Sequence, residues 1–438
     1  MDIRTKGFGE RTPVKEALEI ILPKAKITDT EKILFKQGLG RVLAEEVIAG
    51  SDVPPFDRAA MDGYAVKAEN TFGASQGNPI YFRLAGEVST GAGSNLEIFR
   101  KEDGIPKVGA RQFGLANASA SFLSELRDFE AVKIMTGAAL PKGANAVVMF
   151  EYTNELEDEV EVFKAVTPGK NVSFKGEDVK KSEVLLRKGR IIRPQDIAML
   201  AAAGRQELKV YRKPQTAIIS TGDELAEPGT KLEAGEIYDA NSYALAALVQ
   251  ASGGIAKRMA IIEDSPEKIR SAINIALEND VILISGATSV GKKDVVPQIV
   301  AELGEILVHG VAMRPGEPTG FGVINKKLVF MLPGYPVAAI VAFETFVRPA
   351  LQKMQGMEIF NPYPQVQARL KRKIASELGR RDFARVKLEK KGEEYLAEPV
   401  RTTGSGIISS LVRADGFVIV PENTEGIEKG EKVMVNLF

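Results

Sequence analysis

A short apolar segment that ends in a serine- and glycine-rich turn constrains the fold of this chain more than any other part. Val281–Ile284 is typical of a strand that is buried on both faces of a parallel sheet. The turn Ser285–Gly291 follows it, and a helix is expected to begin near Asp294. Small residues at the carboxyl end of such a strand let backbone N–H groups approach a phosphate. The segment alone is equally compatible with a tight connection that binds no ligand.

Strands and helices alternate on both sides of this segment. Strands are predicted at Thr216–Ser220, Arg258–Ile262, Val281–Ile284, Phe321–Ile324 and Leu328–Leu332, and helices at Asn241–Ala251, Ser265–Glu278, Asp294–Leu303 and Pro336–Met354. This alternation predicts a three-layer α/β domain with a mostly parallel sheet.

The flanking regions have different patterns. The N-terminal part predicts helices at Thr12–Leu22 and Glu31–Gln37, followed by a β-rich region of short strands. Within that region, Gly91–Phe129 is rich in Gly, Ala and Ser and is interpreted as a long insertion. Beyond Pro362, short predicted strands alternate with Gly-, Asn- and Lys-rich turns and indicate a small β-domain.

Composition excludes several kinds of chemistry. The 438 residues include no cysteine and one histidine, His309, so disulfides, thiolate nucleophiles, Cys-ligated zinc and His-rich metal sites are excluded. The 58 basic and 58 acidic residues balance, so no net field favours nucleic acid or an acidic membrane surface. No apolar run approaches the roughly 20 residues of a membrane span, and no signal-peptide core is recognised. We therefore expect a cytoplasmic protein.

Polar and small residues follow four of the predicted strands. These segments are Thr221–Glu224, Glu263–Asp264, the Ser285–Gly291 turn and Pro333–Pro336. Because carboxyl ends of parallel strands share one edge, we expect them to form a single rim. Carboxylates beside a phosphate cradle require a bridging cation, and Mg²⁺ takes one or two carboxylates together with phosphate oxygens. The alternative for Asp223 and Glu224 is an ordinary helix-start or turn role.

Several longer motifs resemble the MoeA family of molybdopterin molybdenumtransferases, which includes the C-terminal part of gephyrin. The resemblance covers nearly the whole chain and suggests an archaeal source. It rests on Pro54–Val66 (PPFDRAAMDGYAV), Lys133–Val148 (KIMTGAALPKGANAVV), Gly176–Asp178 (GED), Ser220–Leu225 (STGDEL), Ile237–Asn241 (IYDAN), Gly404–Leu411 and Ala414–Gly416.

The family implies a homodimer of four-domain subunits with a site completed across subunits. The implied domains are residues 1–50 with 166–205 (a helical and extended linker domain), 51–165 (β-rich, with the insertion), 206–355 (the α/β molybdopterin-binding domain) and 356–438 (a C-terminal β-barrel). The implied reaction inserts molybdate or tungstate into adenylylated molybdopterin and releases AMP with Mg²⁺ present. The molybdopterin adenylyltransferase is an expected partner.

Site residues are carried over from the family by motif. Those implied in catalysis are Asp62, Thr136, Glu224, Asp264 and Asp294. Those implied in binding the pterin and its phosphates are Thr221, Gly222, Asp223, Asn241, Ser285, Gly286, Ser289, Gly291, Arg314, Pro333, Gly334 and Pro336. The metal would be held by Asp223, Glu224 and Asp294.

The chain also departs from the family pattern at positions associated with anion binding. Gly310 and Glu317 stand where the family has basic residues, and Tyr335 and Ala338 stand where it has Asn and Ser. Two functions therefore remain open. One is a working transferase, and the other is a weakened paralogue that binds pterin or a partner as a scaffold. A nucleotide pyrophosphatase is disfavoured because it would not need the first two domains.

Overall fold

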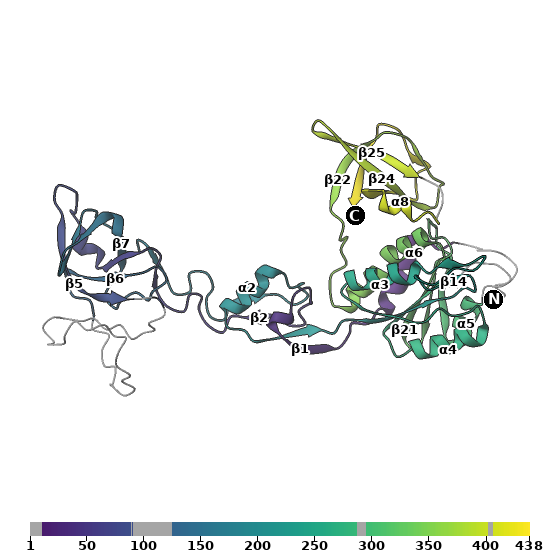
Figure 1. Ribbon diagram of the computed structural model, residues 1–438, viewed down its shortest axis with the longest axis horizontal. Coiled ribbons are helices and arrows are strands. Elements are labelled where there is room, and N and C mark those ends of the chain that lie inside the picture. The colour runs from purple at the N-terminus through teal and green to yellow at the C-terminus, as the bar shows by residue number, and fades with distance from the viewer. Residues whose placement is uncertain (1–10, 89, 91–124, 287–294, 402–405) are drawn as a thin grey trace. The chain divides into compact units, whose positions relative to one another are not determined.

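The computed structural model describes residues 11–88, 90, 125–286, 295–401 and 406–438. The chain divides into two compact units, and each is described by itself (Figure 1). The first comprises Met1–Glu45, Lys188–Arg193 and Glu207–Phe438, and the second comprises Glu46–Arg187 and Pro194–Gln206. The finer domain boundaries expected from the sequence stay predictions.

A six-stranded sheet forms the centre of the first unit. In spatial order its strands are β16 (Ile255–Arg258), β13 (Gln215–Ser220), β17 (Val281–Ser285), β21 (Lys327–Leu332), β20 (Gly320–Ile324) and β18 (Glu305–His309). The pairings among β16, β13, β17 and β21 are parallel, whereas β20 pairs antiparallel with both β21 and β18. The sheet is therefore mixed. The tight turn between β20 and β21, in which Asn325 and Lys326 have positive φ, reverses the chain without a crossover helix.

Helices cover both faces of this sheet, as the alternation of strands and helices predicts. One face packs against α1 (Val14–Ile21), α3 (Asn241–Ala251), α6 (Pro336–Ala342) and α7 (Arg348–Met354), and the other against α4 (Pro266–Ala276) and α5 (Val296–Leu303). A turn of π-helix, Phe343–Val347, joins α6 to α7.

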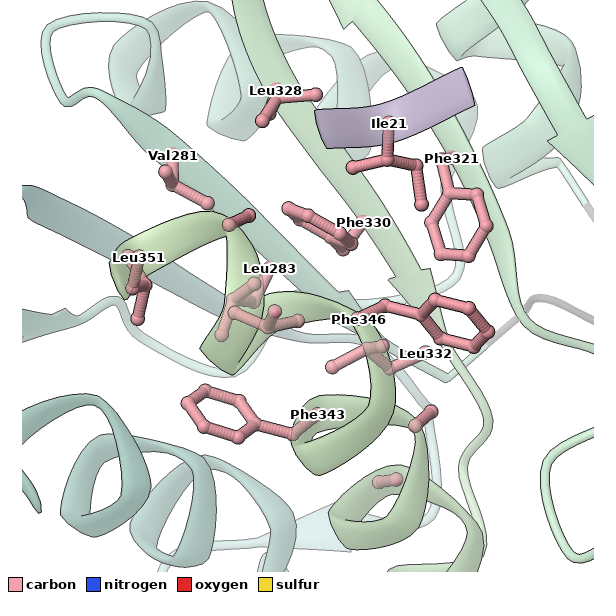
Figure 2. Packing of buried hydrophobic residues seen from close by; sticks show 14 of the residues in the cluster. Ile21, Val281, Leu283, Phe321, Leu328, Phe330, Leu332, Phe343, Phe346 and Leu351 are labelled. Carbon is pink, nitrogen blue, oxygen red and sulfur yellow. The ribbon is translucent and has the colours of Figure 1, made fainter. Parts of the chain in front are cut away.

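The side chains of the central strands alternate between these two cores. Val281 and Leu283 of β17 face the first core, and Ile282 and Ile284 face the second. Figure 2 shows the first core, in which Ile21 of α1 packs near Phe330 and Phe321. The N-terminal helix, predicted to belong to a linker domain, thus contributes to the α/β core.

The C-terminal strands close into a barrel. Its strands are β22 (Gln365–Leu370), β24 (Arg381–Lys391), β25 (Glu394–Arg401), β26 (Gly416–Val420) and β28 (Lys432–Leu437). The order β24–β25–β22–β28–β26 returns to β24, so the five strands have no free edge within the ring. A two-residue strand of the α/β domain, β19 (Met313–Arg314), pairs parallel with the start of β24. This pairing brings Arg314 beside the barrel.

Shorter elements complete the first unit. They are β1 (Thr30–Leu34) paired with β12 (Glu207–Tyr211), β14 (Leu225–Ala226) paired with β15 (Ile237–Tyr238), β23 (Ile374–Ala375) paired with β27 (Gly426–Ile427), and α8 (Ser409–Val412).

The second unit contains the predicted β-rich domain. Its curled sheet has the order β7 (Ala146–Met149), β4 (Gly63–Val66), β6 (Glu130–Ile134), β5 (Ile80–Val88), β9 (Glu159–Val162) and β8 (Thr153–Glu155). The small ribbons β2 (Val47–Ile48) with β11 (Val184–Leu186) and β3 (Arg58–Ala59) with β10 (Val172–Ser173), and the helix α2 (Pro194–Ala202), belong to the same unit. Apolar clusters cover both faces of the sheet.

Several secondary-structure predictions were wrong. The segment predicted as a helix at Glu31–Gln37 is the strand β1 followed by a single 3-10 turn, because β1 pairs along its whole length with β12. The strand predicted at Arg258–Ile262 lies earlier, at β16, and β18 and β25 were not predicted. Most of the predicted insertion, residues 91–124, lies outside the described residues. None of the described helices is long and apolar enough to cross a membrane.

Candidate functional site

The predicted rim exists at the carboxyl edge of the parallel strands. Ser220 of β13 pairs in register with Ser285 of β17, which pairs with Leu332 of β21, so the residues that follow lie side by side. The N–H of Thr221 donates to the carbonyl of Ser285 at 3.0 Å, and the N–H of Gly286 donates to the carbonyl of Leu332 at 3.4 Å. The three strand ends are therefore tied together by backbone hydrogen bonds.

Two rim positions require glycine for a physical reason. Gly286 has φ +102°, and a Cβ there would lie 2.1 Å from the carbonyl oxygen of Thr221. Gly222 has φ +156°, a conformation that other residues rarely adopt. Gly286 thus allows two neighbouring strand ends to approach closely, with or without a ligand.

Asn241, the first residue of α3, connects the rim to the loop after β21. Its Nδ2 donates to Ser285 Oγ and to the carbonyl oxygen of Gly334, each at 2.8 Å. Its Oδ1 is buried and has no hydrogen-bond partner among the described residues. A buried acceptor without a donor is costly, so this atom can accept a hydrogen bond from a ligand or a water.

Three of the predicted acidic residues lie together beside Thr221. Asp264 accepts a 2.5 Å hydrogen bond from Thr221 Oγ1, and the N–H of Asp264 donates at 3.0 Å to Asp223. The side chains of Asp223 and Glu224 are exposed on the rim. The described residues hold no group of three carboxylate or imidazole side chains placed for a metal. Two exposed carboxylates nonetheless fit Mg²⁺, which completes its shell with water and phosphate oxygens.

Part of the predicted site lies outside the described residues. Ser289, Gly291 and Asp294 belong to the segment 287–294, which the structure does not describe. Their predicted roles, including Asp294 as a metal ligand, stay predictions. The remaining rim residues are described: Pro333 is buried, Gly334 is exposed, and Pro336 is the first residue of α6.

A cavity of about 450 Å³ adjoins the rim. The α/β domain contributes Met313–Pro318, Pro333, Tyr335 and Ala338, and the barrel contributes Ile374, Ala375, Arg380 and Asp382–Arg385. Pro333 lines this cavity, and Asn241 of the rim donates to the adjacent Gly334, so one loop contributes to both.

Two arginines make this cavity cationic. Burial lowers the pKa of Arg385 below its ordinary value, and the nearby charge of Arg314 lowers it further. Arg380 also lines the cavity, where it forms hydrogen bonds with Asp382 at 2.8 and 3.2 Å and an ion pair with Glu377. Two like charges that face the same cavity repel each other, and a bound anion would relieve that repulsion.

Glu317 lines the same cavity but is not an uncompensated negative charge. Its carboxylate forms a 2.6 Å ion pair with Arg11 from the N-terminal segment. The backbone on either side fixes this arrangement: the N–H of Thr12 donates to the carbonyl of Gly310 at 3.1 Å. Gly310 itself has φ +92°, a conformation that a lysine there would adopt only with strain. Glu317 is therefore paired locally, and Gly310 occupies a conformation that favours glycine.

Asp62 and Thr136 come together in the second unit. One carboxylate oxygen of Asp62 accepts from the backbone N–H of Thr136 at 2.6 Å and from its hydroxyl at 2.7 Å. These hydrogen bonds, the backbone one first, hold the pKa of Asp62 below its ordinary value. Both side chains are exposed. The adjacent Gly63 is structural, because a Cβ there would lie 1.9 Å from the carbonyl oxygen of Val148.

Comparisons with known proteins cover the chain almost from end to end. Residues 12–204 match the MoeA N-terminal region (domains I and II), residues 217–353 match a probable molybdopterin binding domain, and residues 367–438 match the MoeA C-terminal region (domain IV). The chain belongs to the MoeA family.

Individual relatives agree with this assignment. A protein of Methanocaldococcus jannaschii, named provisionally as a molybdopterin biosynthesis protein, is 45% identical over 97% of this chain and 98% of its own length. Molybdopterin molybdenumtransferase of Staphylococcus aureus is 33% identical over 97% of this chain and 95% of its own length. The crystal structure of the MoeA protein from Pyrococcus horikoshii has a TM-score of 0.79 and 38% identity, covering 98% of this chain and 99% of that one.

Sequence reasoning missed Arg11 and Arg385 of this MoeA-family chain. Arg385 lies in β24 between the buried residues Ala384 and Val386. A charged residue inside a buried run was the available signal, since buried charges are rare without a partner or a role. Arg11 offered no such signal, because only the folded chain brings it to Glu317.

Proposed function

We propose that this protein is a molybdopterin molybdenumtransferase that inserts molybdate or tungstate into adenylylated molybdopterin and releases AMP. The observation that carries the proposal is the cavity lined by Arg314 and Arg385, which shares the loop after β21 with the rim of strand ends. A tetrahedral oxyanion fits the cavity by charge, and a phosphorylated pterin fits the rim by the acceptor Oδ1 of Asn241 and by glycines that let the backbone approach a phosphate.

Each described part of the site has a distinct task in this proposal. Arg314 and Arg385 bind the oxyanion, whose charge offsets their mutual repulsion. Asn241 holds the Gly334 loop through one hydrogen bond. Its Oδ1 would accept a hydrogen bond from an N–H group of the pterin. Asp223 and Glu224 would hold Mg²⁺, which supplies positive charge at the phosphoanhydride during its hydrolysis. Asp264 fixes the hydroxyl of Thr221 at the strand end.

The scaffold alternative is less well supported. It rested on the loss of basic residues at positions 310 and 317 and of a hydroxyl at position 338. The ion pair between Glu317 and Arg11 removes the largest of these objections, because it cancels the carboxylate charge close to its source. Ala338 lines the cavity without a hydroxyl, and this is the observation that still favours the scaffold alternative.

The direct test measures AMP release from adenylylated molybdopterin with Mg²⁺, with and without molybdate or tungstate. We expect the oxyanion to accelerate release and Arg314→Gln to lower the rate at least tenfold. The matched control is Arg369→Gln, which removes a half-buried arginine of the barrel that pairs with Glu394 outside the cavity. Release that does not respond to oxyanion or to the change at Arg314 would leave the scaffold function.

A homodimer whose two units combine across subunits is the assembly that we propose. Asp62 and Arg314 lie in different units of one chain. If they act in the same site across subunits, inactive Asp62→Ala and Arg314→Gln chains should complement each other when mixed. Half of the randomly formed dimers would be mixed, each with one intact site, which predicts about a quarter of wild-type activity. Absence of recovery after verified subunit exchange would place the whole site within one chain. Association with the molybdopterin adenylyltransferase is a further proposal, testable by co-sedimentation.

A further inference from the structure

The cavity that we assign to the oxyanion has a carboxylate in its wall. Glu317 lines it together with Arg314 and Arg385, and an unpaired carboxylate there would repel a dianion. The side chain of Glu317 is 30% exposed, so solvent does not fully screen it. Cancelling its charge locally would therefore strengthen the attraction of the cavity for anions.

The N-terminal segment supplies the cancelling charge. An Arg11 nitrogen lies 2.6 Å from a Glu317 oxygen. The next residue is fixed by backbone pairing on both sides: Thr12 N–H donates to Gly310 at 3.1 Å, and its carbonyl accepts from Ala312 at 2.9 Å. This strand-like pairing places Arg11 beside Glu317. Arg11 itself does not line the cavity.

We propose that Arg11 is a positioning residue for anion binding, which acts by neutralising and orienting Glu317 so that the Arg314–Arg385 cavity keeps its positive potential. This inference rests on the proposed function, because it concerns the oxyanion pocket of the same site. It assigns to the N-terminal segment an electrostatic role at a cavity that this segment does not line.

Four chains separate this role from direct contact with the anion: wild type, Arg11→Ala, Glu317→Gln and the double variant. Tungstate binding is measured for each by calorimetry at two ionic strengths. A unit charge and a dianion about 10 Å apart at an effective dielectric of roughly 50 imply about a tenfold change in Kd. We expect Arg11→Ala to bind about tenfold more weakly, Glu317→Gln to bind more tightly, and the double variant to return to wild type. All differences should shrink with added salt.

The double variant is decisive. If it binds as weakly as Arg11→Ala, then Arg11 contacts the anion itself and the inference is wrong. Equal affinity in all four chains would also overturn it. Lys15→Ala and Glu19→Gln serve as matched controls, because they alter an exposed ion pair of α1 outside the cavity. Thermal unfolding checks that each variant is folded.

A second readout does not depend on the substrate. The chain has no cysteine, so Ala375→Cys places a single thiol at an exposed position of the cavity wall. The pKa of that thiol, measured from the pH dependence of alkylation, reports the local potential. We expect Arg11→Ala to raise it by about half a pKa unit and Glu317→Gln, added to Arg11→Ala, to restore it.

The two readouts distinguish failure of the inference from failure of the proposed function. A thiol pKa that is the same in all four backgrounds overturns the inference, whatever the activity. A thiol pKa that shifts as expected in a chain that binds no tungstate supports the charge arrangement and contradicts the proposed transferase.

Discussion

Replacing Asn241 by aspartate tests whether its amide holds the rim together. The side-chain Nδ2 donates to Ser285 Oγ and to the Gly334 carbonyl, each at 2.8 Å. A carboxylate has the same shape but donates nothing when ionised. The hydroxyl of Ser285 can rotate and donate to it, whereas the Gly334 carbonyl can only accept. In Asn241→Asp, the hydrogen bond with Ser285 is therefore kept with its direction reversed. The hydrogen bond to Gly334 is lost and becomes a contact between two acceptors.

The expected cost follows from that count. Losing one hydrogen bond costs about 1 kcal/mol, and an acceptor pair adds a repulsion of about the same size, so we expect about 2 kcal/mol of lost stability at pH 7. The introduced carboxyl avoids this repulsion when protonated, because it then donates to the carbonyl. Its pKa in the folded state is consequently raised above the unfolded value of about 3.9, by about 1.5 units for 2 kcal/mol.

The sign of the pH dependence is then determined. With a raised folded pKa, the folded variant binds more protons than the unfolded chain, so its stability relative to wild type falls as pH rises from about 4 to about 5.5 and is constant above. Urea unfolding of Asn241→Asp, Asn241→Ala and wild type at pH 4 and pH 7 measures this. Asn241→Ala should lose about 1–2 kcal/mol at both pH values, because it has no group to titrate.

The assay also has a functional arm. AMP binding, measured by calorimetry at pH 7, should weaken in both variants, because the Gly334 loop loses its connection to α3. A variant Asn241→Asp that is as stable as wild type at pH 7, or whose deficit is the same at pH 4, would refute the hydrogen-bond assignment.

Three further predictions follow from other contacts. Gly286→Ala should destabilise the chain by about 2–4 kcal/mol in urea unfolding, since its Cβ would meet the Thr221 carbonyl and its φ is left-handed. Asp280, whose pKa is lowered by Arg212 despite burial, should contribute stability above about pH 4 that is lost as pH falls through its folded pKa, and Asp280→Asn should remove this dependence. Asp62→Asn should lower AMP release at least tenfold while leaving the urea midpoint nearly unchanged, because Asp62 is exposed.

Local patterns were sufficient for the elements that bury regular apolar faces. The helix Asn241–Ala251 and the strand ends at Ser220, Ser285 and Leu332 match the predicted segments closely. Their sequence periodicity reflects burial on one or two sides, which is set within a few residues of chain. The prediction that strand ends share a rim is confirmed for the same reason: parallel pairing leaves the carboxyl ends at one edge.

Elements that depend on a distant partner could not be predicted. A helix is predicted at Glu31–Gln37 from its own residues, yet Thr30–Leu34 is a strand because it pairs with Glu207–Tyr211. Only the parallel pairing of β19 with β24 brings Arg314 to the cavity shared with Arg385.

The sequence was sufficient to exclude cysteine chemistry and to predict the α/β core and most of the rim residues. Tertiary structure alone decided the charge of the cavity. From the sequence, Glu317 is a negative charge at a position where a basic residue is expected. In the folded chain it pairs with Arg11, about 300 positions away. Charge at a site is a sum over neighbours in space, and its energy falls with distance between atoms rather than with separation along the chain.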